Sequence, residues 1–210
     1  MTGETPDLSL EDISCAYGYH VVFSGLNITM PAGRVVTLVG PNGAGKTTLM
    51  KLIAGLHPAH SGVIRWGGDV SDSLARRFLC HWISTEFPLK PKLSVHDNLR
   101  FLMSLKTGHS PDSVVIRQAL SWLNIDLLID KRVETLSSGQ RTRVFLASLM
   151  LDHRPIWLLD EPSASLDESG RLVLKSMIQR HAKKKNGLVI IATHDPQLFG
   201  GEQIVEMGHK

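Results

Sequence analysis

The sequence contains few cysteines and no long apolar segment. Only Cys15 and Cys80 are present among 210 residues, and two cysteines without a motif exclude a disulfide framework and indicate reduced thiols. The longest apolar stretches, at residues 156–159 and 188–192, are far shorter than the roughly 18 to 20 residues that cross a bilayer. The chain is therefore not expected to span a membrane by itself.

The sequence also lacks a strong charge imbalance and a secretory signal. The net charge of +3, with ten histidines, is too small to indicate a nucleic-acid partner, and we expect none. The first ten residues lack the basic and then apolar order of a signal peptide, so we expect residence in the cytoplasm or in an organelle matrix. The one basic run, at residues 183–185, is typical of a solvated helix end.

What the sequence does contain is an alternation of strand-like and helix-like segments. An apolar strand at residues 35–39 precedes a glycine loop and a helix-like segment at residues 47–55, and buried strands are expected at residues 156–159 and 188–192. This alternation predicts an α/β fold with a parallel sheet. Short strand-like pieces at residues 8–14, 21–23 and 26–30 predict a small antiparallel sheet beside it.

Residues 86–136 change to helical periodicity, which predicts an inserted helical lobe. The apolar positions that carry this pattern are Val95, Leu99, Leu102 and Leu105 on one face, followed by Val115, Ala119 and Leu123. No internal repeat or linker divides the chain, so we expect one composite domain over residues 8–210. Within it we expect an antiparallel part at 8–33, an α/β core at 34–85 and 137–210, and a helical subdomain at 86–136.

The first chemical motif is a phosphate-binding loop of the form G-x-x-x-x-G-K-T, placed after a strand and before a helix. Its glycines let backbone N–H groups point at phosphates, and the helix N-terminus adds its positive dipole end. We expect Lys46 to neutralise the β- and γ-phosphate oxygens and Thr47 to bind Mg²⁺ through its hydroxyl. The nucleotide-binding residues expected here are Gly40, Pro41, Asn42, Gly43, Ala44, Gly45, Lys46, Thr47 and Thr48.

The second motif is an apolar strand that ends in two carboxylates, Asp160 and Glu161. Side chains alternate along a strand, so the two carboxylates point in different directions and suit different tasks. We expect Asp160 to lie near Mg²⁺ and Glu161 to polarise the attacking water. Such a pair is common after apolar strands, but an upstream phosphate loop makes the combination specific.

The third motif is Leu136-Ser137-Ser138-Gly139-Gln140, followed by a helix-like segment at residues 141–151 that ends just before the carboxylate strand. Taken alone, it predicts only an N-capped helix start. With the other two motifs it resembles the L-S-G-G-Q signature of ATP-binding-cassette (ABC) ATPases, with Ser138 in place of the first glycine. The resemblance extends over about residues 8–193. It implies a P-loop NTPase (RecA-like) core with a small antiparallel β subdomain and an inserted helical subdomain, a fold that binds ATP and Mg²⁺ and works as a dimer.

The same resemblance assigns tasks to residues outside the phosphate loop. It implies that Ser137 and Gly139 contact the γ-phosphate bound to the opposite subunit, with Gln140 part of the same binding motif. Residues 165–167 resemble the loop that crosses the dimer interface, which adds Asp167. His194 resembles the switch histidine that hydrogen-bonds the γ-phosphate, which makes it a catalytic candidate with Glu161 and Lys46.

Two positions stay open in the sequence. Tyr17 fits the aromatic residue that stacks on adenine, Tyr19 is the competing candidate, and ordinary packing is the other interpretation of both. At the junction to the helical lobe, where ABC ATPases usually carry a glutamine, Glu86 or a neighbour stands instead. We expect the side chain of Glu86 to be exposed to solvent, because uncompensated negative charge beside a triphosphate is costly.

Within the ABC family, the phrases at residues 23–26, 52–56, 93–99 and 154–162 resemble the ATP-binding subunits of haem exporters in cytochrome c maturation. This resemblance implies ATP hydrolysis that powers haem-related export, with a second copy of the chain and integral membrane subunits as partners. It implies a peripheral position on the cytoplasmic face of the inner membrane or on the matrix face of the mitochondrial inner membrane. The alternatives are the ATP-binding subunit of another ABC transporter and a soluble ABC ATPase not tied to transport.

Overall fold

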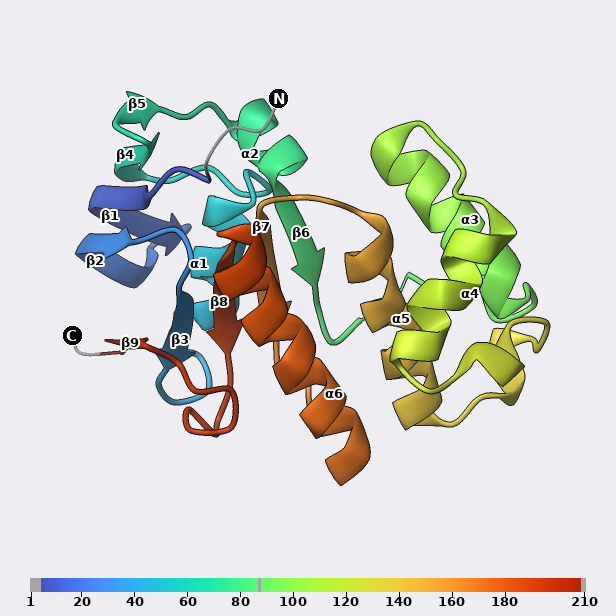
Figure 1. The fold of residues 1–210 in the computed structure, drawn as a ribbon. Coiled ribbons are helices and arrows are strands. Elements are labelled where there is room, and N and C mark those ends of the chain that lie inside the picture. Colours follow the sequence, from blue (N-terminus) through green and yellow to red (C-terminus); the bar gives the residue numbers. More distant parts are fainter. Residues whose placement is uncertain (1–4, 87, 209–210) are drawn as a thin grey trace. The chain divides into compact units, whose positions relative to one another are not determined.

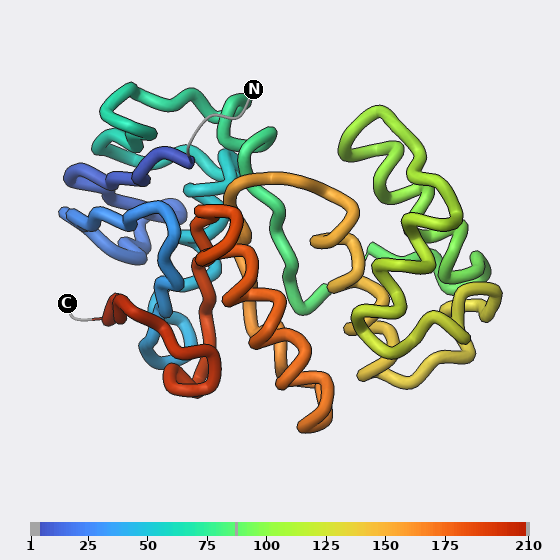
Figure 2. Tube along the Cα trace, viewed as in Figure 1, coloured from blue at the N-terminus to red at the C-terminus, as the bar shows by residue number. Residues whose placement is uncertain are grey.

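The chain divides into two compact units (Figure 1; Figure 2). The structure, a computed structural model, describes residues 5–86 and 88–208. The first unit comprises the described residues up to Trp82, Arg154–Glu161 and the described residues from Met177 onward. The second unit comprises the described residues of Ile83–His153 and the segment Pro162–Ser176, which follows the two carboxylates. Within the described part of the chain, no helix is long and apolar enough to cross a membrane.

A five-stranded sheet carries the phosphate loop and the carboxylates. Its strand order is β6-β7-β8-β3-β9, formed by Cys80–Ile83, Ile156–Asp160, Leu188–Ala192, Val35–Val39 and Gln203–Glu206. The pairs of β3 with β8, β3 with β9 and β7 with β8 are parallel. Because parallel strands end at the same edge of a sheet, the loops after β3, β7 and β8 leave the sheet side by side. The apolar strands expected from the sequence are thus confirmed.

A second, antiparallel sheet has the order β2-β1-β4-β5, formed by His20–Met30, Leu8–Tyr17, Ser61–Trp66 and Asp69–Val70. The sequence suggested three short strands before residue 31, whereas the structure has two long ones. Register shifts between β1 and β2 absorb the interruptions, and Gly25 adopts a φ of 65° that favours glycine. The sheet also recruits β4 and β5, which sequence reasoning placed in the core range.

The helix α1 (Lys46–Ile53; labelled in Figure 1) shares one apolar core with both sheets. Leu49 and Ile53 of α1 are fully buried in a cluster that also contains Leu8 and Ile13 of β1 and Leu158 of β7. Burying a leucine or isoleucine side chain of this kind stabilises the fold by about 1.5–3 kcal/mol. The strand before the phosphate loop and the helix after it are therefore both fixed by core packing.

Trp157 of β7, the strand that ends in the carboxylates, packs against His181. His181 lies in the π-helical turn Arg180–Lys184, into which α6 (Glu168–Gln179) continues. The helix α2 (Ser73–Leu79) belongs to the same first unit. The two rings stack with centroids 3.9 Å apart, and the His181 Nε2–H donates to the carbonyl oxygen of Pro155 at 3.0 Å. Burial lowers the pKa of His181 to about 4, so the ring is neutral near pH 7 and serves packing.

The second unit is helical. Its elements are α3 (Val95–Thr107), α4 (Ser113–Trp122), two short 3₁₀ turns at Asp126–Leu128 and Val133–Thr135, and α5 (Ser138–Leu151). The helices α3, α4 and α5 pack against one another. The expected boundaries placed α5 with the α/β core, whereas its contacts group it with α3 and α4.

Burial in α3 and α4 follows the expected helical pattern in part. Val95, Leu99 and Leu102 are buried as the periodicity predicts, but the expectation for Leu105 is wrong, since this side chain is 70% exposed. In α4, Val115 is 44% exposed, while Ala119 and the following Leu123 are buried. The buried positions missed by the expectation are Asn98, Met103, Ile116 and Leu120. Ile116, Ala119, Leu120 and Leu123 follow the i, i+3, i+4, i+7 spacing of one helix face, so the expectation for Val115 placed it on the wrong face.

Candidate functional site

The phosphate loop is a backbone turn that only glycine fits at its critical positions. Gly40 has a φ of 149°, and a Cβ there would lie 2.4 Å from the carbonyl oxygen of Met207. Gly43 and Gly45 have φ values of 84° and 92°, in the left-handed region that favours glycine. Gly45 caps α1, which begins at Lys46. The loop thus directs the first turn of α1, with its free N–H groups, toward the space that phosphates would fill.

Lys46 folds over this loop. Its Nζ donates to the carbonyl oxygen of Gly40 at 2.7 Å and to that of Pro41 at 3.0 Å, and its side chain is buried. These two carbonyl acceptors hold the ammonium group at the phosphate loop. The expected partnership between Lys46 and phosphate oxygens stays a prediction.

Thr47 and Asp160 meet although 113 residues separate them. The Thr47 hydroxyl donates to Asp160 Oδ2 at 2.6 Å, because α1 starts beside the end of β7. Asp160 is buried, whereas Thr47 is exposed. A hydroxyl and a carboxylate oxygen on adjacent elements are the hard donors that Mg²⁺ prefers. The residues present therefore fit the expected metal site.

Glu161 occupies a constrained position immediately after β7. Its φ of 47° is unusual for a residue other than glycine, and its N–H donates to the carbonyl oxygen of Ala192 at 2.9 Å. Burial raises the pKa of Glu161, while the nearby charge of His194 lowers it. His194 Nε2 lies 3.3 Å from Glu161 Oε1. A carboxylate that is partly withdrawn from water is a stronger base, which suits the polarisation of a water molecule.

The two candidate tyrosines both present exposed rings. Tyr17 is 47% exposed and makes an edge contact with His57 at a centroid distance of 4.8 Å, and Tyr19 is fully exposed. A cavity of about 850 Å³ borders the phosphate loop, and its lining residues come from β2, residues 41–44 and residues 206–208. Neither tyrosine lines that cavity. The choice between Tyr17 and Tyr19 for adenine stacking stays a prediction.

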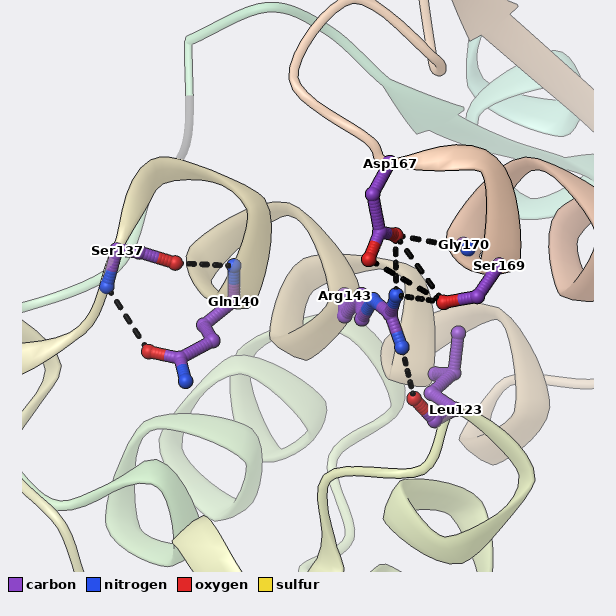
Figure 3. Close-up of polar contacts among 7 residues, drawn as sticks. All are labelled: Leu123, Ser137, Gln140, Arg143, Asp167, Ser169 and Gly170. Atoms are coloured by element: carbon purple, nitrogen blue, oxygen red, sulfur yellow. Dashed lines mark hydrogen bonds and ion pairs between the residues drawn. The ribbon is translucent and has the colours of Figure 1, made fainter.

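The signature segment begins α5 with a capping box (Figure 3). The Ser137 hydroxyl accepts from the Gln140 N–H at 3.2 Å, and the Ser137 N–H donates to Gln140 Oε1 at 2.9 Å. A Cβ on Gly139 would lie 2.8 Å from the carbonyl oxygen of Ser165, so this glycine allows the following turn to approach. A cavity of about 460 Å³ is lined by Ser137, Gly139, Gln140, Asp167 and their neighbours.

Asp167 has a structural task that sequence reasoning missed. Its carboxylate accepts the Gly170 N–H at 2.9 Å at the start of α6, which is the geometry of a helix N-cap. The hydrogen bonds from Gly170 and Arg143 lower the pKa of Asp167. Arg143 of α5 forms an ion pair with this carboxylate (Figure 3). An aspartate just before a helix-like segment is a preferred N-cap residue, but nothing in the sequence indicates its partner Arg143.

Glu86 behaves as expected in one respect. Its side chain is exposed, and its carbonyl oxygen accepts the Ser84 hydroxyl at 2.9 Å. Glu86 and the signature belong to the helical unit, whereas the phosphate loop, Asp160, Glu161 and His194 belong to the first unit. The candidate residues therefore form two separate groups, one within each unit.

Comparisons with known proteins agree with this arrangement. A family model described as ABC transporter matches residues 23–164. The cytochrome c biogenesis ATP-binding export protein CcmA of Paramagnetospirillum magneticum is 35% identical over 93% of this chain and 92% of its own length. The protein of the same name from Nitrobacter hamburgensis is 38% identical over 90% and 92%. ABC transporter I family member 1 of Arabidopsis thaliana is 35% identical over 92% and 84%.

Solved structures give the same picture of the fold. A putative ABC transporter ATP-binding protein from Pyrococcus furiosus superimposes with a TM-score of 0.83 at 31% identity, over 96% of this chain and 97% of that one. A bacterial Atm1-family ABC exporter with ATP bound has a TM-score of 0.85 at 20% identity, over 97% of this chain and 37% of that one. The second likeness concerns the fold alone.

Proposed function

This chain belongs to the ABC transporter family and is an ATP-binding, ATP-hydrolysing subunit, and from that premise we propose that it works as a Mg²⁺-dependent homodimer that powers haem-related export in cytochrome c biogenesis. The observation that carries the proposal is the similarity to export proteins of cytochrome c biogenesis over about nine-tenths of both chains. In this role the chain docks on integral membrane subunits. It is then held at the cytoplasmic face of the inner membrane, or at the matrix face in a mitochondrion.

In the proposed reaction, the first unit binds the triphosphate. The N–H groups of the phosphate loop and the ammonium of Lys46 hold the β- and γ-phosphates, which requires Lys46 to leave the carbonyl oxygens of Gly40 and Pro41. Thr47 and Asp160 hold Mg²⁺, which when bound offsets the negative charge of the phosphate oxygens. The Thr47–Asp160 hydrogen bond already orients both oxygen donors.

Glu161 then acts on water. The carboxylate of Glu161 accepts a proton from the attacking water. The hydrogen bond from the Glu161 N–H to the carbonyl oxygen of Ala192 fixes the backbone from which this side chain extends. His194, whose Nε2 lies 3.3 Å from Glu161 Oε1, donates a hydrogen bond to the γ-phosphate. In the dimer, Ser137 and Gly139 of the opposite subunit close over the γ-phosphate, and the first turn of α5 adds its N–H groups.

The first test is a dimerisation assay on Glu161→Gln. This variant keeps the shape of the side chain and loses its basicity, so it should bind Mg-ATP, hydrolyse it very slowly and accumulate as a dimer. Size-exclusion chromatography with light scattering, with and without Mg-ATP, measures this. Lys46→Ala in the same background is the matched control and should stay monomeric. A monomer at saturating Mg-ATP in Glu161→Gln would refute the dimer.

The second test identifies the membrane partners. Tagged Glu161→Gln protein is captured from detergent-solubilised membranes of the source organism with Mg-ATP, and the retained proteins are identified by mass spectrometry. Integral membrane subunits encoded with cytochrome c maturation proteins support the proposal. Membrane subunits of an unrelated transporter indicate the alternative of another ABC transporter, and recovery without any membrane subunit indicates an ABC ATPase not tied to transport.

A further inference from the structure

Arg143 is the centre of a polar network in the helical unit that the proposed reaction leaves unexplained (Figure 3). Its guanidinium donates to the carboxylate of Asp167, to the Ser169 hydroxyl at 2.7 Å and to the carbonyl oxygen of Leu123 at 3.1 Å. These acceptors come from three places: the residue after α4, the turn before α6 and the first turn of α6. The side chain of Arg143 is only 12% exposed, whereas that of Asp167 is 67% exposed, so the ion pair is open to water on the carboxylate side.

The residues around Arg143 are packed so closely that their side chains have little room to move. A Cβ on Gly170 would lie 2.9 Å from Asp167 Oδ1 and 3.2 Å from Arg143 Nε. Ser169 Oγ also lies 3.2 Å from Asp167 Oδ2, which holds the carboxylate from a third side. One turn before Arg143 along α5, the backbone at Gly139 approaches the carbonyl oxygen of Ser165. The signature turn and residues 165–170 are therefore joined at two points.

We propose that Arg143 is a positioning residue for ATP hydrolysis, which holds the signature turn and the turn at residues 165–167 in one fixed arrangement and ties both to the end of α4. The inference rests on the proposed dimer, in which both turns meet the nucleotide of the opposite subunit. Arg143 does not touch that nucleotide. It acts by presenting Ser137, Gly139 and Asp167 together, so that closure of the dimer engages them in one step.

Arginine suits this task for a geometric reason. Its planar guanidinium offers five N–H donors in fixed directions, so one side chain serves a carboxylate, a hydroxyl and a backbone carbonyl at once. Lysine keeps the charge but cannot reproduce this fork, because its donors radiate from a single nitrogen atom. Arg143→Lys therefore separates the effect of charge from that of geometry.

The kinetic test compares Arg143→Lys, Arg143→Ala and the control Arg141→Ala. Arg141 lies two residues earlier on α5 with an exposed side chain, and no hydrogen bond of that side chain is found among the described residues. We expect kcat to fall by about tenfold or more in Arg143→Ala, which removes all three contacts, and by roughly threefold in Arg143→Lys, which keeps the charge without the planar fork. The KM for ATP should change by less than about threefold, because the first unit keeps its phosphate-binding residues. Arg141→Ala should stay within about twofold of wild type.

The structural test uses Asp167→Asn. Asparagine is as good an N-cap as aspartate, so this variant keeps the cap on α6 and removes the ion pair. If the pair is what positions the turns, Arg143→Ala and Asp167→Asn combined should lose little more than either alone. Circular dichroism of each variant checks folding. If Arg143→Ala does not fold, Arg143→Lys and Asp167→Asn still decide the matter.

A second readout is dimer formation in the Glu161→Gln background. The Mg-ATP concentration that gives half-maximal dimer should rise about tenfold on adding Arg143→Ala and should not change on adding Arg141→Ala. If the Arg143 variants match Arg141→Ala in both kcat and dimer formation while Glu161→Gln itself dimerises, the positioning role is refuted. If Glu161→Gln alone fails to dimerise, the proposed dimer is refuted instead, together with the inference that rests on it.

Discussion

The hydrogen bond between Thr47 and Asp160 can be tested without any nucleotide or metal. Thr47→Val replaces the hydroxyl by a methyl group of similar size, so the buried carboxylate of Asp160 loses its donor at 2.6 Å. A hydrogen bond to a charged group contributes about 1.5–3 kcal/mol when both partners are sheltered. Thr47 is exposed, so water can replace part of the lost bond, and we expect a cost of about 1–2 kcal/mol.

This loss of stability should appear as a lower melting temperature. For a chain of 150–250 residues, 1 kcal/mol corresponds to about 2–4 °C, so Thr47→Val should melt about 2–8 °C below wild type. The measurement is thermal unfolding followed by circular dichroism in EDTA and without nucleotide, which removes any contribution from bound Mg-ATP. Thr47→Ser is the matched control, because it keeps the hydroxyl and loses only an exposed methyl group.

The result that would refute this reasoning is equally specific. If Thr47→Val melts at the same temperature as Thr47→Ser, the hydrogen bond contributes nothing to the stability of the free protein. In that case Thr47 and Asp160 are not held together before the metal arrives. A separate titration of Mg²⁺ in the ATPase assay should show weaker apparent metal binding in Thr47→Val than in Thr47→Ser, since valine offers no oxygen ligand.

Three further predictions concern individual side chains of the proposed reaction. Lys46→Ala should abolish ATP turnover and weaken nucleotide binding, as measured by phosphate release and by fluorescent-nucleotide titration; turnover equal to wild type would show that the site lies elsewhere. His194→Ala should move the acidic limb of the kcat–pH profile to higher pH. Loss of the neighbouring charge lets the pKa of Glu161 rise further above its usual value, so a higher pH is needed to ionise this base. An acidic limb that stays at the wild-type pH would contradict this. Glu86→Gln should leave Mg-ATPase activity within about threefold of wild type, equivalent to roughly 0.7 kcal/mol of barrier, since its side chain is exposed; a change of about tenfold in turnover or in the half-maximal Mg²⁺ concentration would place the carboxylate inside the site.

Local sequence determined the parts of this protein that depend on short-range sterics and hydrogen bonding. The strands Val35–Val39 and Leu188–Ala192 have the predicted bounds, because strands buried on both faces are continuous apolar runs. The phosphate loop follows from glycines whose φ values other residues avoid. The start of α5 follows from the S-x-x-Q spacing of its capping box.

Only the tertiary structure decided which distant residues meet. Thr47 reaches Asp160 because β3 and β7 belong to one sheet with β8 between them, and strand order is not written in either segment. The left-handed backbone of Glu161 depends on the carbonyl oxygen of Ala192 in β8. Arg143 contacts Asp167 across 24 residues, although the neighbours of Arg143 in the sequence indicate only a helix. Burial of Met103 and exposure of Leu105 were likewise set by neighbouring helices, because helical periodicity describes one helix and packing is a property of several.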